Sequence, residues 1–310
     1  MSQDSGDTWR TDGHYYLAAL EPTDGDPQFV MALGREVSED ELELVTASHR
    51  ALKKFWPREW LADLSEATAD VILSREQLDH QVRVRSRLTS DEHRRMEGSL
   101  REWLAHFSAF DQHLPISVSQ HFGRDRMRQV KGIVDAVKHR DYAYRLAWAL
   151  RNFTLHQGSV ITHSGYTTSE DGSHELRLGV EPYKLAQRDR DQRADAALRE
   201  TAGPIPVETF VQRGFLAAER VLIESMLAVR DDIYLRITAL EDLAHEVLGD
   251  TPDAQARIVL LQPKVDGSIG QMVMHDIPTE YREGFDEFYG QCAQVMNRPV
   301  PTTTPEDLVG

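Results

Sequence analysis

Helical patterns between residues 38 and 157 constrain the fold of this chain more than any other feature. Ser38 and Glu41 form a capping box, and the segment 89–92 (TSDE) opens another helix. Behind each start, apolar residues recur every three or four positions and so lie on one side of a helix. The stripe after residue 92 consists of Met96, Leu100, Trp103, Leu104, Phe107 and Phe110. Pro115 is expected to kink or end that helix.

Three further helices are predicted in the same region. One has Pro57 in its first turn and continues to Val82, and the next follows Gly123. The last spans residues 141–157 and ends at Gly158, where a left-handed cap is expected. Because the loops between these five helices are short, neighbouring helices should run antiparallel. The expected fold class is mainly α, an antiparallel helical bundle with small β-hairpin additions and an α+β C-terminal part.

The remaining segments predict the β elements and the domain boundaries. Strands are expected at 15–20, 28–33, 160–164, 175–180, 257–262 and 269–274. The predicted domains are 1–36 (short strands), 37–185 (bundle with a β-hairpin), 186–206 (linker), 207–297 (long helix plus a small α+β part) and 298–310 (disordered tail). The long helix after residue 207, with a break near 230–232, should pack against the bundle because its apolar stripe needs a partner surface.

Composition and missing motifs exclude several classes of protein. The single cysteine, Cys292, rules out an internal disulfide and a thiolate metal cluster. No P-loop, dinucleotide-binding, zincin or α/β-hydrolase motif occurs, and Asp242 with His245 is the nearest approach to a di-iron Glu-x-x-His pair. The N-terminus lacks a leader pattern, and no apolar run reaches about 18 residues. We therefore expect a cytoplasmic protein without a membrane span, a metal ion or another cofactor.

One stretch runs against the acidic character of the chain. The formal net charge is -16, which would repel a polyanion on average. Residues 124–151, however, contain eight Lys or Arg residues and three Asp residues, a local net charge of +5. Either this stretch binds an anion or it is a solvated helix surface with ordinary ion pairs between successive turns.

The basic stretch leads into the segment YAYRLAWALRNFTLHQG, residues 142–158. Arg151 is followed there by Asn152, and His156 comes four residues after the asparagine. Arg101 and His106 have the same spacing, so the apolar helix, the asparagine and the terminating glycine distinguish the later pair. The segment resembles the signature of the HEPN superfamily, helical bundles that carry Arg, four to six residues and then His. The resemblance covers residues 38–158.

The resemblance implies a metal-independent endoribonuclease, of the kind found in phage defence and toxin-antitoxin systems. His156 would take a proton from a ribose 2'-hydroxyl, Arg151 would stabilise the phosphorane and Asn152 would orient the phosphate, leaving a 2',3'-cyclic phosphate. The RNA-binding residues would come from the basic stretch: Arg124, Arg128, Lys131, Lys138 and Arg145. The expected partners are RNA, a second copy of the chain in a homodimer, and an antitoxin or regulatory protein.

Helix geometry supports a shared site in part. Asn152 and His156 lie about 40° apart around a helix, whereas Arg151 and His156 lie about 140° apart. Only a side chain as long as arginine can span that angle. A position near a helix C-terminus also favours the protonated form of His156.

Three alternatives remain open. In the first, Arg151 pairs with an acid such as Asp141 or Asp135, and His156 merely ends a helix. In the second, the whole chain is a non-catalytic helical module that binds or regulates a protein partner. In the third, several histidines form the metal site of a metal-dependent hydrolase. If the chain binds RNA, we expect Arg124, Arg128, Lys131 and Arg151 to line one cleft around His156. Scattered ion pairs of these side chains with Glu and Asp would favour the binding module.

Overall fold

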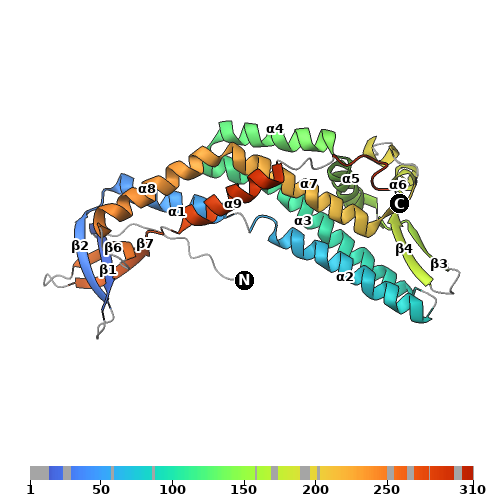
Figure 1. Cartoon of the computed structure of the whole chain (residues 1–310), viewed down its shortest axis with the longest axis horizontal. Helices are drawn as coiled ribbons and strands as arrows, with labels where there is room; N and C mark the ends of the chain where they lie inside the picture. Colours follow the sequence, from blue (N-terminus) through green and yellow to red (C-terminus); the bar gives the residue numbers. More distant parts are fainter. Residues whose placement is uncertain are drawn as a thin grey trace. The chain divides into compact units, whose positions relative to one another are not determined.

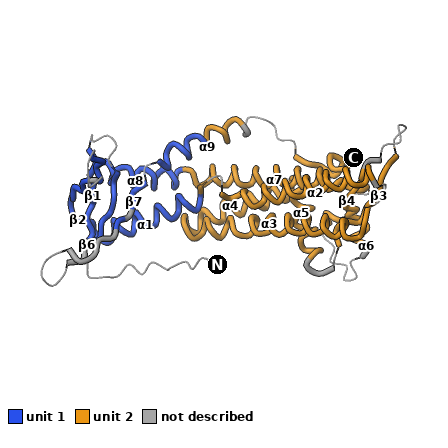
Figure 2. The backbone as a smooth tube through the Cα atoms, turned by 90° about the horizontal axis from the view of Figure 1, so that it is seen from below, with its two compact units in different colours: residues 1–55, 231–288 blue, residues 56–230, 289–310 orange. Residues whose placement is uncertain are grey.

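The structure is a computed structural model that describes residues 14–23, 29–56, 59–85, 88–157, 159–168, 174–188, 196–200, 203–249, 255–263, 269–278, 280–296 and 302–309. Two compact units divide the chain (Figure 2). Unit 1 consists of residues 1–55 and 231–288, and unit 2 of residues 56–230 and 289–310. Each unit joins segments that are far apart in the sequence, whereas the predicted domains are continuous segments. In the described part of the chain, no helix is both long and apolar enough to span a membrane.

Four helices of unit 2 contact one another in a closed ring (Figure 1). Helix α2 (Ala62–Arg85) packs on α3 (Ser90–Phe122), and α3 packs on α4 (Arg124–Arg140). Helix α7 (Val207–Ala228) contacts both α4 and α2 and so completes the ring. The mainly α prediction is confirmed. Pro115 lies inside α3 and does not end it.

Trp103 lies at the centre of this helix packing. Its Nε1 donates to Thr68 Oγ1 of α2 at 2.8 Å, and its ring stacks on Phe107 and meets Phe210 of α7 edge to face. Gly214 of α7 faces the same indole, and a Cβ there would lie 2.6 Å from the Trp103 ring. The predicted apolar stripe of α3 is buried throughout. One aromatic side chain therefore holds α2, α3 and α7 together.

Helix α5 (Tyr142–Gln157) packs on α3, α4 and α7. Tyr144 Oη donates to Asp111 Oδ1 at 2.7 Å near the start of α5, whereas Val160 N, just after its end, donates to Glu97 Oε1 at 2.9 Å. Helix α5 therefore runs opposite to α3. Helix α4 begins directly after α3 and brings Lys138, near its end, close to the same Asp111, so it also runs opposite to α3. The prediction that neighbouring helices are antiparallel is therefore wrong for α4 and α5. Gly158, the predicted cap, lies outside the described residues.

The rest of unit 2 surrounds one end of the helices. Strands β3 (His163–Thr168), β4 (His174–Val180) and β5 (Ile205–Pro206) form an antiparallel sheet in the order β3-β4-β5, and β4 packs on α2. The predicted hairpin is confirmed. Helix α6 (Pro182–Arg188) precedes the 3-10 helix η1 (Ala196–Arg199). Ala197 and Leu198 of η1 are buried, so this part of the predicted linker belongs to the packed unit.

Unit 1 contains a four-stranded antiparallel sheet in the order β2-β1-β6-β7. Its strands are β1 (His14–Pro22), β2 (Phe29–Glu36), β6 (Gln255–Pro263) and β7 (Ile269–Asp276), which confirms the four strands predicted in these segments. Strand β1 pairs with β6, so the two hairpins join into one sheet. The helices of the unit are α1 (Glu39–Lys54), α8 (Arg230–Leu248) and the first half of α9 (Tyr281–Met296).

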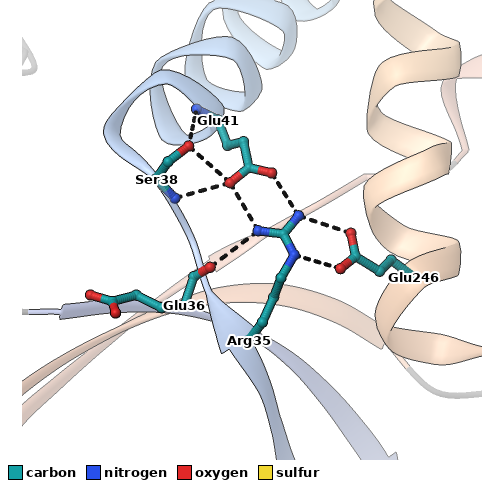
Figure 3. A network of polar contacts seen from close by, with 5 residues as sticks. All are labelled: Arg35, Glu36, Ser38, Glu41 and Glu246. Carbon is teal, nitrogen blue, oxygen red and sulfur yellow. Dashed lines mark hydrogen bonds and ion pairs between the residues drawn. The ribbon is translucent and has the colours of Figure 1, made fainter.

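A single guanidinium group connects three elements of unit 1 (Figure 3). Arg35 of β2 donates to the carboxylate of Glu41 at 2.9 and 2.6 Å and to that of Glu246 in α8 at 2.5 and 2.9 Å. Glu41 also accepts from the backbone N of Ser38 at 3.0 Å, which completes the predicted capping box of α1. The capping residue therefore has a second role as an ion-pair partner.

Two predictions about the bundle and the tail are wrong. The first predicted helix, α1, belongs to unit 1 and not to the bundle. The first half of the predicted long helix, α7, packs on the bundle as expected, whereas α8 from residue 231 belongs to unit 1. The tail was expected to be disordered, but residues 302–309 pack on unit 2: Leu308 is buried, and Thr303 exchanges backbone contacts with the start of α5. Neither arrangement follows from local periodicity, because each depends on a surface supplied by distant residues.

Candidate functional site

A pocket of about 430 Å³ lies between α3 and α5 in unit 2. Two turns of α5 contribute Arg151 and Thr154, and one face of α3 contributes Arg101, Ser108, Gln112 and His113. Gln112 Nε2 donates to Ser108 Oγ at 3.0 Å, so part of the wall is a fixed polar surface. No carboxylate is among the lining residues that the structure describes. The pocket therefore combines two guanidinium groups with neutral hydrogen-bonding groups, which is suited to an anion.

Arg151 is half-buried and forms no ion pair with any described residue. Its Nη1 donates to Asn152 Oδ1 at 3.1 Å. Asp141, one of the acids considered as its partner, instead accepts from the backbone N of Tyr144 at 3.0 Å and of Thr303 at 3.1 Å. The alternative in which Arg151 pairs with Asp141 or Asp135 is therefore not observed among the described residues, and the guanidinium keeps hydrogen-bonding capacity toward the pocket.

The positive charge of Arg151 affects the pKa of one partly buried carboxyl group, that of Asp111. Burial raises the pKa of Asp111, while the hydrogen bond from Tyr144 and the positive charges of Lys138 and Arg151 act in the opposite direction. Burial also raises the pKa of Tyr144 far above its ordinary value, so its hydroxyl stays a donor. The hydrogen bond between Tyr144 and Asp111 fixes the start of α5 against α3. It thereby sets which residues of α3 lie opposite Arg151.

Glu97 lies on α3 one turn before Arg101, outside the pocket lining. Its carboxylate accepts from the backbone N of Val160 at 2.9 Å and of Ile161 at 3.0 Å, and from Ser159 Oγ at 2.8 Å. The same carboxylate accepts from Arg101 Nε at 3.2 Å. One buried side chain thus holds both a pocket arginine and the chain that follows α5.

The predicted catalytic residues share α5 but do not all line the pocket. Arg151 does, and Asn152 contacts the Arg151 guanidinium, which indicates that the amide orients the arginine. His156 lies on the last turn of α5, and its side chain is outside the described part of the structure. On an ideal helix its position is about 40° from Asn152, on the same strip as Arg145 and Trp148.

The predicted RNA-binding residues do not gather around Arg151. Arg124, Arg128 and Lys131 are exposed on the first half of α4, and Arg128 pairs with Asp125 one turn away. The other two residues engage groups close to α5. Lys138 lies 3.2 Å from the centre of the Trp148 ring, and Arg145 pairs with Glu200. The expectation that these side chains line a single cleft is wrong, because successive turns of α4 face different neighbours.

Sequence reasoning missed Arg101, His113 and Glu97. Arg101 and His113 lie on the polar side of α3, where nothing in the local pattern separates them from other surface residues. Glu97 looks like another charged residue of a helix that carries many. Its burial follows only from the backbone of residues 159–161, more than 60 positions away.

The described residues contain no group of three or more His, Cys, Asp or Glu side chains arranged to hold a metal ion. Comparisons with protein-family models, with curated proteins and with solved structures found no match for the chain.

Proposed function

We propose that this chain is a metal-independent endoribonuclease of HEPN type in which the α3–α5 pocket binds the RNA phosphate. The observation that carries the proposal is the pairing of Arg151 with Arg101 in one pocket whose described lining holds no carboxylate. On a chain with a net charge of -16, such a local concentration of guanidinium groups is suited to a phosphodiester.

The proposed reaction is transfer of the RNA phosphate to the neighbouring 2'-oxygen. His156 removes the proton from the 2'-hydroxyl, the 2'-oxygen bonds to phosphorus, and the bond from phosphorus to the 5'-oxygen breaks as that oxygen takes up a proton. Arg151 stabilises the negative charge on the phosphorane, and Asn152 holds the guanidinium in place through its 3.1 Å hydrogen bond. The products are a 2',3'-cyclic phosphate and a 5'-hydroxyl.

The biological setting belongs to the same proposal. A role in phage defence or a toxin-antitoxin system, a homodimer that brings two motifs to one cleft, and control by an antitoxin or regulatory protein all come from the resemblance of residues 142–158 to the superfamily signature.

The test is cleavage of a mixed pool of end-labelled RNAs by the full chain in EDTA. Arg151→Ala and His156→Ala should each lower the rate by a factor of about 100 or more, since each removes a group that acts in the transition state. Arg94→Ala is the matched control, because Arg94 pairs with Asp91 on the exposed surface of α3. Circular dichroism checks the fold of every variant. Cleavage that survives both α5 substitutions would rule out this site.

A second candidate is a non-catalytic helical module that binds a regulatory partner. It is favoured by the ion pairs of Arg128 and Arg145, which use basic side chains that an RNA site would leave free. Absence of cleavage from the wild-type chain in the same assay, with its fold intact, would support this function and contradict the first.

A further inference from the structure

Arg101 is the least expected member of the α3–α5 pocket. Its Nε donates to Glu97 Oε1 at 3.2 Å, and its side chain is 46% exposed. Among the described residues, neither terminal nitrogen of Arg101 has a hydrogen-bond partner. A guanidinium has donors on two edges, so a contact through Nε leaves the two terminal nitrogens available for a second acceptor. That geometry suits two oxygens of one phosphate.

Glu97 does not need Arg101 to satisfy its carboxylate. Only 11% of the Glu97 side chain is exposed, and the carboxylate already accepts from Val160 N, Ile161 N and Ser159 Oγ. A contact between a half-exposed arginine and an already satisfied carboxylate adds little to stability. Its clearer consequence is geometric, because it holds the Arg101 side chain in one direction along the pocket wall.

The Glu97 carboxylate also binds the chain that follows the proposed catalytic helix, α5. Residues 159–161 follow α5 directly, and three of the Glu97 contacts go to them. The position of Arg101 and the position of the α5 end are therefore set by one buried group. A change at Glu97 should alter both together.

We propose that Arg101 is a second phosphate-binding residue for the RNA strand and that Glu97 is its positioning residue. This inference rests on the proposed function and adds to it. Arg151 acts on the phosphate that is cleaved, and Arg101 binds a neighbouring phosphate of the same strand. The pocket volume of about 430 Å³ falls within the range of small-ligand sites, so it admits about one nucleotide unit between the two guanidinium groups.

Binding is measured separately from cleavage with a fluorescent 2'-fluoro RNA oligonucleotide, which lacks the attacking hydroxyl. Fluorescence anisotropy of the full chain in EDTA, over a series of salt concentrations, gives Kd and its salt dependence. Arg101→Gln should raise Kd about tenfold, because a hydrogen-bonded phosphate contact is lost. The slope of log Kd against log salt should fall by about 0.7, the value for one phosphate of a single strand.

Arg94→Gln is the matched control. Arg94 also lies on α3, pairs with Asp91 one turn away and is 76% exposed, so its loss should leave Kd unchanged. Arg101→Lys keeps the charge but not the planar pair of donors, and it should give an intermediate Kd.

Glu97→Gln tests the positioning role. If Glu97 acts through Arg101, the double variant with Arg101→Gln should bind no more weakly than Arg101→Gln alone, whereas a purely structural role predicts additive losses. Urea unfolding establishes whether Glu97→Gln is folded. If it is not, Arg101→Lys and Arg101→Gln still decide the main claim.

The outcomes separate this inference from the proposed function. Wild-type binding and cleavage that Arg101→Gln leaves unchanged would overturn the role of Arg101 and leave Arg151 and His156 intact. Binding that Arg101→Gln weakens, from a chain that cleaves no RNA, would support the phosphate contact and reject the nuclease. A wild-type chain that neither binds nor cleaves overturns both.

Discussion

Arg35 illustrates how far a single side chain reaches in unit 1. Its hydrogen bonds lower the pKa of Glu41 from the ordinary value of 4.5 to about 2, and they also lower the pKa of Glu246. A carboxyl whose pKa is lower in the folded chain stabilises the fold above its unfolded pKa, and this stabilisation is lost as pH falls toward the folded pKa. The stability that the Arg35 network provides is therefore lost between about pH 4.5 and pH 2.

We expect Arg35→Gln to flatten the acid dependence of stability. Without the guanidinium, the pKa of Glu41 returns toward its ordinary value, so less stability is lost between about pH 4.5 and pH 2. Urea unfolding of both proteins at a series of acid pH values measures the difference. Arg94→Gln, which breaks one exposed pair within a single helix, should keep the wild-type slope. Parallel curves for wild type and Arg35→Gln would contradict the assignment.

His49 predicts a second pH dependence at a higher range. Burial lowers its pKa, with a smaller contribution from Lys53, while the charges of Glu280 and Asp276 act in the opposite direction. Its Nδ1 is buried without a partner among the described residues, and its ring lies 6.0 Å from that of Tyr281. The unfolded chain binds a proton at about pH 6.5, whereas the folded chain resists it, so stability falls as pH drops below about 6.5.

His49→Phe should therefore reduce the loss of stability between pH 7 and pH 5, because the variant has no proton to bind at this position. The free energy of unfolding in urea at the two pH values provides the test. His80→Phe, at an exposed position of α2, is the control. An equal pH effect in wild type and His49→Phe would show that other groups cause it.

At the scale of elements, α3 and α7 approach each other closely at Gly214. A Cβ at Gly214 would lie 2.6 Å from Cη2 and 3.0 Å from Cζ2 of Trp103, whose indole is also held by Thr68. Gly214→Ala should cost about 1–3 kcal/mol of unfolding free energy, because α7 or the indole has to shift. Thermal or urea unfolding followed by tryptophan fluorescence measures the loss.

Gly132→Ala is the matched control for that prediction. Gly132 lies in α4 with no atom within 4 Å of an added Cβ, so alanine should stabilise the helix by about 0.5–1 kcal/mol. The two substitutions add the same methyl group and are expected to have opposite signs. Stabilisation by Gly214→Ala would mean that Trp103 is not packed against α7.

At the scale of the whole chain, the C-terminal segment is part of unit 2. Leu308 is fully buried, and Asp141 accepts from the backbone N of Thr303 and of Tyr144, which links the segment to the start of α5. Leu308→Ala should lower the unfolding free energy by about 2–3 kcal/mol through the cavity it leaves. It should also increase hydrogen exchange in the first turns of α5, which mass spectrometry of peptic fragments can measure.

Glu306→Ala serves as the comparison, because Glu306 is exposed in the same segment and should change neither quantity. Exchange in α5 that is the same for Leu308→Ala and wild type would show that the segment does not hold this helix.

Local sequence patterns are sufficient to define most individual helices and strands of this chain. The capping boxes at Ser38 and Thr89 define the starts of α1 and α3, and the apolar stripe from Met96 to Phe110 is the buried face of α3. The strands β1, β2, β4, β6 and β7 also lie close to where the apolar segments predict them, whereas β3 begins three residues later than expected. These features depend on residues a few positions apart, so local spacing and backbone preference are sufficient to define them.

Tertiary structure alone decided which elements meet. Four arrangements depend on surfaces separated by 50 or more positions in the sequence. They are the pairing of β1 with β6, the position of α7 in the bundle, the docking of residues 302–309 and the approach of Arg101 to Arg151. Of the candidate site, Arg151 and Asn152 were predictable because they belong to one local motif. Arg101 and Glu97 were not, because an arginine or glutamate on a helix acquires its role only from the chain that folds against it.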